Sequence, residues 1–263
     1  MTLNYEALTA RNVGLVTEQA TLRDMTVAIA GCGAEGGSTA VTLARMGVGA
    51  LRLCDPDVFD ESNLNRQWGS TVDTIGKNKA QVVADMVREV NPLCDVSSDP
   101  MGVTPISVAS LCEGSDIVIE AVDYWRTDIA VMLHRECRAR HIPVLVGASV
   151  GWGSIALLFE PDGLTFEEYV GADPTQPTEA FADFTLPASA YCPEPLPYVS
   201  EDMQSSVASG EVDIPVVAPS VNMTGAMLAS FALFRVTGQR QLLPAPHYYA
   251  MSDLMTLEPR MCP

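Results

Sequence analysis

The stretch TVAIAGCGAEGG, residues 26–37, decides the fold class. Its first five residues form a short apolar run, which is typical of a strand buried in a parallel sheet. A glycine motif with the spacing G-x-G-x-x-G follows, and residues 38–46 continue with a helical pattern. Such glycines allow a tight turn and the close approach of a phosphate, and the helix N-terminus favours the anion. The glycines of the motif are Gly31, Gly33 and Gly36.

Strand and helix patterns alternate along the next hundred residues. Alternation of this kind predicts a parallel sheet with helices on both faces. We therefore expect an α/β fold with a Rossmann-like, doubly wound and mostly parallel sheet. The predicted strands are residues 50–54, 116–122 and 142–146, and the predicted helices are residues 77–90 and 128–140.

The pattern changes after residue 150. Residues 153–160 resemble a strand with no crossover helix before it, and a proline-rich segment with weak periodicity follows at residues 161–219. A loop of that length is usually functional or mobile. We expect residues 1–150 to form the nucleotide-binding half and residues 151–263 to add a C-terminal, substrate-side lobe within one continuous domain. The lobe ends in a predicted helix at residues 218–236 and a predicted strand at residues 247–253.

The composition limits the partners. The chain has 263 residues, of which 48% are hydrophobic and 18% charged, and its formal net charge is -18. A surface this acidic repels nucleic acid and anionic membranes at long range, so we expect neither as a partner. The excess charge is sufficiently explained by solubility, although a partner with a basic face or tail would also suit it.

Targeting and cysteine signals point to the cytoplasm. The N-terminus lacks an apolar signal core, and the apolar stretch at residues 216–234 is interrupted by Pro219, Asn222 and Gly225, so we expect a buried helix there. The seven cysteines are scattered without any C-x-x-C pair, so we expect reduced thiols and no zinc site.

Polar residues after the strands suggest the chemistry. Asp55 follows the second strand, where a carboxylate commonly accepts ribose hydroxyls. To this point a NAD-dependent oxidoreductase and an ATP-using enzyme fit equally well. Arg66, Lys79 and Asp123 favour the second, because cleavage of the α–β phosphate bond needs cations on the leaving pyrophosphate and a metal. All three are expected near the carboxyl ends of the strands, where ligands bind in such sheets.

Five motifs resemble one family. The strings GCGAEGG, DPD, SNLNRQ, GKNKA and EAVD are similar to the adenylation domain of the ubiquitin-activating enzyme superfamily, with the bacterial ThiF/MoeB/HesA-like branch as the best match. The resemblance covers residues 11–147 and resumes at residues 215–238. SNLNRQ is highly specific, whereas the glycine motif alone is not.

The resemblance implies roles for individual residues. Asp55 would hold the ribose, while Asn63 and Arg66 would contact the phosphates with support from Gln67. Lys79 would bind the phosphates and stabilise the leaving group. Asp123 would hold Mg²⁺, with Asp57 as a second candidate ligand, and Arg11 would reach the ATP of the neighbouring subunit in a homodimer.

The resemblance also implies a substrate. Members activate a C-terminal carboxylate as an acyl adenylate, usually on a small β-grasp carrier protein ending in Gly-Gly, or on a peptide. Transfer to sulfur, a thiol or an amine can follow. Cys192 lies alone in the proline-rich segment and is the candidate nucleophile for such a second step.

Several positions depart from the family pattern. Ala34 replaces a usual glycine, and Asp123 is followed by Tyr124-Trp125 where Asn is common. Glu35 would repel phosphates, so we expect its carboxylate to point away from them or to act through a metal. These departures leave open a non-catalytic partner subunit of the same fold. An oxidoreductase and an enzyme that activates a carboxylate on modified tRNA are further alternatives.

Overall fold

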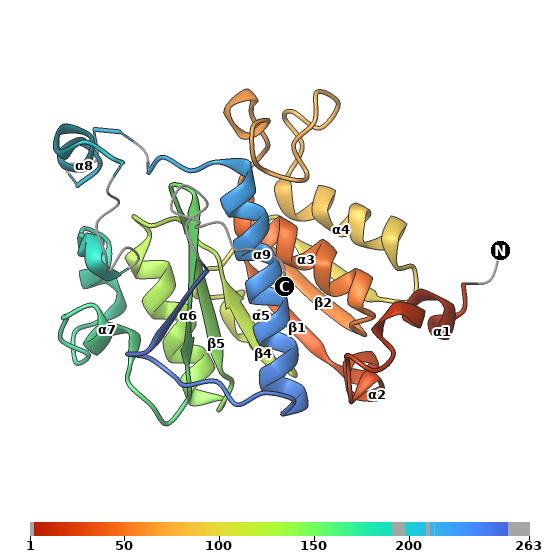
Figure 1. Ribbon diagram of the computed structural model, residues 1–263. Coiled ribbons are helices and arrows are strands. Elements are labelled where there is room, and N and C mark those ends of the chain that lie inside the picture. Colours follow the sequence, from red (N-terminus) through yellow and green to blue (C-terminus); the bar gives the residue numbers. More distant parts are fainter. Residues whose placement is uncertain (1–2, 191–197, 209–210, 213, 252–263) are drawn as a thin grey trace, which may run out of the picture.

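The computed structural model describes residues 3–190, 198–208, 211–212 and 214–251. Within this part of the chain, one seven-stranded sheet runs in the order β3-β2-β1-β4-β5-β6-β7 (Figure 1). The α/β architecture expected from the sequence is confirmed. The strands are β1 Thr26–Ala30, β2 Ala50–Cys54, β3 Asp95–Asp99, β4 Ile117–Glu120, β5 Val144–Val150, β6 Gly153–Phe159 and β7 Tyr248–Met251.

The sheet is parallel from β3 to β5 and antiparallel beyond. Ala30, the last residue of β1, lies opposite both Cys54 at the end of β2 and Glu120 at the end of β4. The glycine motif and the loops after β2 and β4 therefore leave the sheet at the same edge. β6 returns directly after β5 and pairs with it antiparallel, which confirms a strand with no crossover helix.

Helices cover both faces of this sheet. Most of the short helices lie near the N-terminus or in the segment after β6. The α-helices are α1 Tyr5–Leu8, α2 Gln19–Asp24, α3 Ala34–Met46, α4 Lys79–Val90, α5 Val108–Cys112, α6 Thr127–Ala139, α7 Phe166–Tyr169, α8 Glu201–Ala208 and α9 Ala218–Thr237. The 3₁₀ helices are η1 Ala10–Asn12, η2 Glu61–Asn63, η3 Thr178–Phe181 and η4 Ala188–Ala190.

Two apolar layers form because successive strand residues face opposite sides. Ile119 of β4 packs in the layer under α3, α4 and α9, whereas Val118 packs in the layer under α5 and α6. The Glu120 side chain follows the alternation and points to the α6 side. A carboxyl group thus ends a strand that is otherwise entirely apolar.

The late helix α9 returns to the first half of the sheet and lies beside α3 (Figure 1). Gly225 permits this close packing, because a Cβ there would lie 2.1 Å from the Ser38 hydroxyl oxygen. The helix also packs on β5 and β6, which explains why its sequence is apolar on most sides. Among the helices of the described residues, none has both the length and the hydrophobicity that crossing a membrane requires.

The structure differs from the sequence prediction in several places. The helix predicted from residue 38 already begins at Ala34, so Glu35 lies in its first turn. The prediction missed β3 and α5, and the segment predicted as a loop at residues 161–219 contains two α-helices. The division near residue 150 remains a prediction, and the sheet continues across it from β5 to β6.

Candidate active site

A cavity of about 470 Å³ opens at the carboxyl ends of the parallel strands. It brings together residues from the glycine loop, from the loop after β2, from α4 and from the turn after β4. The predicted site residues that line it are Gly31, Gly33, Asp55, Asp57, Asn63, Arg66, Gln67, Lys79 and Asp123. The structure thus places nine of the predicted residues around one space, while their roles remain predictions.

The glycine loop needs two of its three glycines for packing. Gly31 has a φ of +93°, and a Cβ there would lie 2.1 Å from the Ala121 carbonyl oxygen. A Cβ at Gly36 would lie 1.8 Å from the Gly31 carbonyl oxygen. Gly36 is buried and acts by closing the turn, whereas Gly31 and Gly33 reach the cavity.

Asp55 connects the glycine loop to the loop after β2. Its Oδ2 accepts a hydrogen bond from the Cys32 backbone N–H at 2.6 Å, and its Oδ1 accepts one from the Asp57 N–H at 2.8 Å. The residue is 5% exposed. Burial raises the pKa of this carboxyl group, and the two N–H donors oppose that shift. Free lone pairs on both oxygens can still accept ribose hydroxyls.

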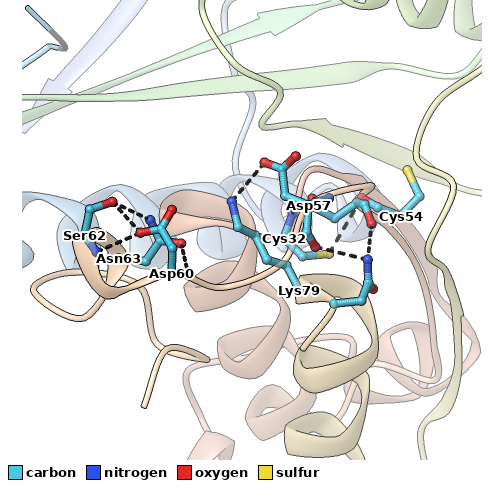
Figure 2. A network of polar contacts seen from close by, with 9 residues as sticks. Cys32, Cys54, Asp57, Asp60, Ser62, Asn63 and Lys79 are labelled. Atoms are coloured by element: carbon cyan, nitrogen blue, oxygen red, sulfur yellow. Dashed lines mark hydrogen bonds and ion pairs between the residues drawn. The ribbon is translucent and has the colours of Figure 1, made fainter. Parts of the chain in front are cut away.

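Lys79 is a buried cation in the wall of the cavity. The residue is 9% exposed, and its Nζ lies 3.0 Å from Asp57 Oδ2. Figure 2 shows the lysine side chain extending from α4 to Asp57. Because the Asp57 side chain is half-exposed, a phosphate entering the cavity can compete with it for the ammonium group.

The turn around η2 carries the SNLNRQ string. Asp60 caps the turn by accepting a hydrogen bond from the Ser62 N–H at 2.7 Å, as Figure 2 shows. Arg66 donates to the Ser62 carbonyl oxygen at 3.0 Å, and the described residues offer it no carboxylate partner. Its charge is therefore available to an incoming anion.

The neighbouring Gln67 supports the glycine loop from the other side. Its amide group lies 3.6 Å from the position of a Cβ on Gly33. Its Oε1 is buried and has no hydrogen-bond partner among the described residues. A ligand N–H or hydroxyl can satisfy this atom.

The turn after β4 brings Asp123 to the cavity, and this residue is exposed to solvent. The next residue, Tyr124, donates its hydroxyl to the Leu186 carbonyl oxygen at 2.5 Å, which ties the turn to the segment after β6. Arg126 also lines the cavity, and its guanidinium contacts Asp128 through two bonds of 3.1 Å. Asp57 and Asp123 supply hard oxygen donors, which fit Mg²⁺.

Glu35, the residue that did not suit a phosphate loop, lines the cavity near β5. Burial raises the pKa of its carboxyl group, while hydrogen bonding by Ser149 and the charge of Arg66 oppose the shift. Ser149 shares a hydrogen bond of 2.8 Å with the Thr224 hydroxyl. The carboxyl group is thus linked to a polar chain between β5 and α9.

Three predicted residues are not among those that line this cavity, and the first of them is Gly36, which is buried in the turn. Arg11 is exposed in η1 and does not line it. Cys192 lies outside the described residues. Among the described residues, no group of three or more His, Cys, Asp or Glu side chains could hold a metal ion. The described cysteines at 32, 54, 94, 112 and 137 are buried free thiols.

Sequence reasoning missed several lining residues. Tyr124 and Trp125 were noted only as departures from a pattern, although both line the cavity together with Arg126. Glu120 also lines it and was not singled out. The sequence feature that could have identified Glu120 is its position as a carboxylate at the end of an otherwise apolar strand.

Known proteins are similar to this chain in sequence and in fold. The chain is 36% identical over 129 residues to the tRNA threonylcarbamoyladenosine dehydratase of Escherichia coli (strain K12), covering 49% of this chain and 47% of that protein. It is 32% identical over 158 residues to the sulfur carrier protein ThiS adenylyltransferase of Bacillus subtilis (strain 168), covering 59% of this chain and 44% of that protein. The chain spans about half the length of these curated relatives.

A solved structure shares the fold. The crystal structure of E. coli MccB with MccA-N7isoASN superposes with a TM-score of 0.69 at 20% identity, covering 95% of this chain and 69% of that chain. The sequence model that describes the ThiF family matches residues 6–262 of this chain. The resemblance seen in the motifs is thereby confirmed, and the chain belongs to the ThiF family.

Proposed function

We propose that the protein uses ATP to adenylate a C-terminal carboxylate of a small β-grasp carrier protein or a peptide. The observation that carries the proposal is the convergence of Lys79, Arg66 and Asp123 on one cavity beside the glycine loop. Hydride transfer would leave the pyrophosphate intact and would not need these cations. The relative named ThiS adenylyltransferase supports the same reaction class.

The site residues divide the binding of ATP among them. The N–H groups of the glycine loop at the start of α3 favour phosphates, because the helix N-terminus carries partial positive charge. Asp55, fixed by two backbone donors, accepts the ribose hydroxyls. Lys79 exchanges its contact with Asp57 for a phosphate oxygen.

The chemistry needs charge stabilisation more than proton transfer. The substrate carboxylate attacks the α-phosphorus, the bond from that phosphorus to the bridging oxygen breaks, and pyrophosphate leaves with the electron pair. Lys79 and Arg66 stabilise the charge that grows on the leaving group. Mg²⁺ held by Asp123, with Asp57 as a second ligand, would neutralise phosphate charge when bound.

We further propose a homodimer in which Arg11 serves the neighbouring site. Arg11 is exposed and does not line the cavity of its own chain, as a residue acting across an interface requires. Val13 and Leu15 nearby are 83% and 72% exposed, so apolar surface is available for such a contact.

ATP–pyrophosphate exchange in the presence of synthetic peptides ending in Gly-Gly tests the proposal. Exchange should require both Mg²⁺ and a peptide with a free carboxylate, and Asp123→Ala should reduce it by at least about 100-fold. Asp162→Asn is the matched control, because its side chain is 91% exposed in the loop after β6. Tight ATP binding without exchange for any carboxylate would instead favour a non-catalytic partner subunit.

A second candidate is favoured by the similarity to the tRNA threonylcarbamoyladenosine dehydratase. In that case the activated carboxylate would belong to a modified tRNA. The charge distribution argues against it, since residues 142–234 contain 12 acidic residues and no Lys, Arg or His. Exchange stimulated by modified tRNA and not by peptides would reverse the order of the two candidates.

A further inference from the structure

The wall of the cavity contains a buried carboxyl group to which the proposed reaction assigns no role. Glu120 ends β4, is 3% exposed and lines the cavity next to the turn that carries Asp123. Its Oε1 accepts a hydrogen bond from the Val122 N–H at 3.1 Å. Its Oε2 is buried and has no hydrogen-bond partner in the described part of the chain.

A second unsatisfied atom faces it from α6. Nε2 of His134 is also buried without a hydrogen-bond partner in the described chain, and it lies 3.9 Å from Glu120 Oε2. Leaving both atoms unpaired would cost about 1–3 kcal/mol each. Their separation is about 1 Å longer than a hydrogen bond, so a small movement of either side chain would let one proton between the two atoms satisfy both.

Aromatic rings and apolar strand residues pack directly against the pair. The His134 ring packs against Phe159 and Phe166, with ring centroids 4.9 and 4.7 Å away. Ala30 and Val146 flank Glu120 in the sheet. Other titratable or charged groups around the pair are the thiols of Cys54, Cys112 and Cys137, which lie on the same sheet face, and Asp123 on the turn. His134 also lines a second cavity, of about 190 Å³. The charged residues around that cavity are Arg135, Arg138, Glu160 and Glu167.

Burial shifts both groups toward their neutral forms. It raises the pKa of Glu120 to about 7 and lowers the pKa of His134 to about 3. The pair therefore changes from net neutral to net negative in the physiological range. At hydrogen-bond distance, the Glu120 carboxyl O–H of the neutral pair would donate to His134, and the carboxylate of the negative pair would accept from a His134 N–H.

The state of Glu120 bears on the turn that carries Asp123. Ala121 donates to the Ala30 carbonyl oxygen at 2.8 Å, and its own carbonyl oxygen fills the space beside Gly31. Beyond Ala121, the Val122 N–H bond to Glu120 holds the start of the turn. A charged acceptor makes such a bond roughly twice as strong as a neutral one.

We propose that Glu120 and His134 share one proton and together position the Asp123 turn, so that deprotonation of the pair tightens the turn and raises the rate of adenylation. The inference rests on the proposed function for its catalytic consequence alone. Glu120 is here a positioning residue, since its contact is with the Val122 backbone.

The first test compares the pH dependence of ATP–pyrophosphate exchange in the wild type and Glu120→Gln. The glutamine can still accept from Val122 and donate to His134, so it fixes the low-pH arrangement. The ratio of wild-type to variant kcat should rise about fivefold from pH 6 to pH 8. Taking the ratio cancels the titration of ATP itself. A ratio that stays constant across this range overturns the proposal.

The second test changes the histidine. His134→Phe keeps an aromatic ring against Phe159 and removes the N–H donor, so the inflection should move to higher pH by at least about half a unit. His141→Gln is the matched control, because that histidine is exposed just beyond the C-terminal end of α6 and its replacement should leave the inflection unchanged. An inflection that stays in place in His134→Phe contradicts the sharing of a proton.

A measurement without catalysis separates the two hypotheses. The protein has three histidines, so nitrogen-15 NMR of the labelled imidazoles can follow His134 directly, with His134→Phe giving the assignment. We expect its shifts to change near pH 7 in the wild type and not in Glu120→Gln. If this holds while exchange is absent, the proposed function fails and the pair stands. If exchange occurs without this titration, the pair fails.

Discussion

Replacing Lys79 by methionine should abolish most of the adenylation activity while leaving the fold intact. Methionine keeps the length of the aliphatic stem and fills the same buried space, so the change removes the ammonium group and little else. The structural cost is the lost pair with Asp57, whose N–O distance is 3.0 Å. The functional cost is the lost cation beside the leaving pyrophosphate.

The two costs differ in size. At 3.0 Å the gross attraction is about 5 kcal/mol for an effective dielectric constant of about 20. Desolvation of Lys79 and the half-exposed position of Asp57 reduce the net value to about 1 kcal/mol, or about 2–4 °C in Tm for a chain of this size. Removal of a donor that stabilises transition-state charge typically costs about 3–4 kcal/mol, or about 100- to 1,000-fold in kcat.

The assay is ATP–pyrophosphate exchange with a peptide ending in Gly-Gly, together with thermal unfolding of the same samples. Lys77→Met is the matched control, because Lys77 is exposed two residues earlier and does not line the cavity. A Lys79→Met rate within about threefold of wild type would refute the reasoning, since it would show that the ammonium group does not face the leaving group.

Further predictions concern stability and assembly. Burial raises the pKa of Glu120 from 4.5 to about 7, so its favourable contribution is present below pH 4.5 and is lost as the pH rises to 7. Glu120→Gln should therefore gain about 3 kcal/mol relative to wild type between pH 4.5 and pH 8, measured by urea unfolding, and an equal difference at both pH values would contradict this. Arg135→Met should destabilise the fold by about 3 kcal/mol, because it leaves the buried Glu167 carboxylate without its partner at 2.7 Å, and adding Glu167→Gln should restore part of the loss. In light scattering the wild type should be a dimer; Arg11→Ala should remain dimeric and lose exchange activity, and a monomeric wild type would exclude action across an interface.

The sequence was sufficient for the elements with strong local signals. The apolar run before Gly31, the helix after it and the strand that begins at Gly153 all leave clear patterns over several residues. β3 was missed because its sequence, DVSSD, is mostly polar. Such a sequence is tolerated in this strand because β3 lies at the edge of the sheet and has a neighbouring strand on one side only. α5 was missed because five residues are too few to display a helical period.

The site was predictable to the extent that its residues follow strand ends. Asp55 and Asp123 could be placed because parallel strands end at one edge of the sheet. The sequence could not predict that the side chains of Glu120 and His134 face each other. Their approach depends on the rotation of α6 against β4 and on the packing of His134 with Phe159, which is distant in sequence.

A crystal structure of the protein with Mg²⁺ and an ATP analogue carrying a methylene group between the α- and β-phosphates tests the central claim most directly. The account predicts the nucleotide in the cavity beside the glycine loop, with phosphate oxygens about 3 Å from Lys79 Nζ and from the Arg66 guanidinium. It also predicts the metal on the Asp123 carboxylate. A nucleotide bound elsewhere, or one whose phosphates leave Lys79 paired with Asp57 and Arg66 in solvent, would contradict it.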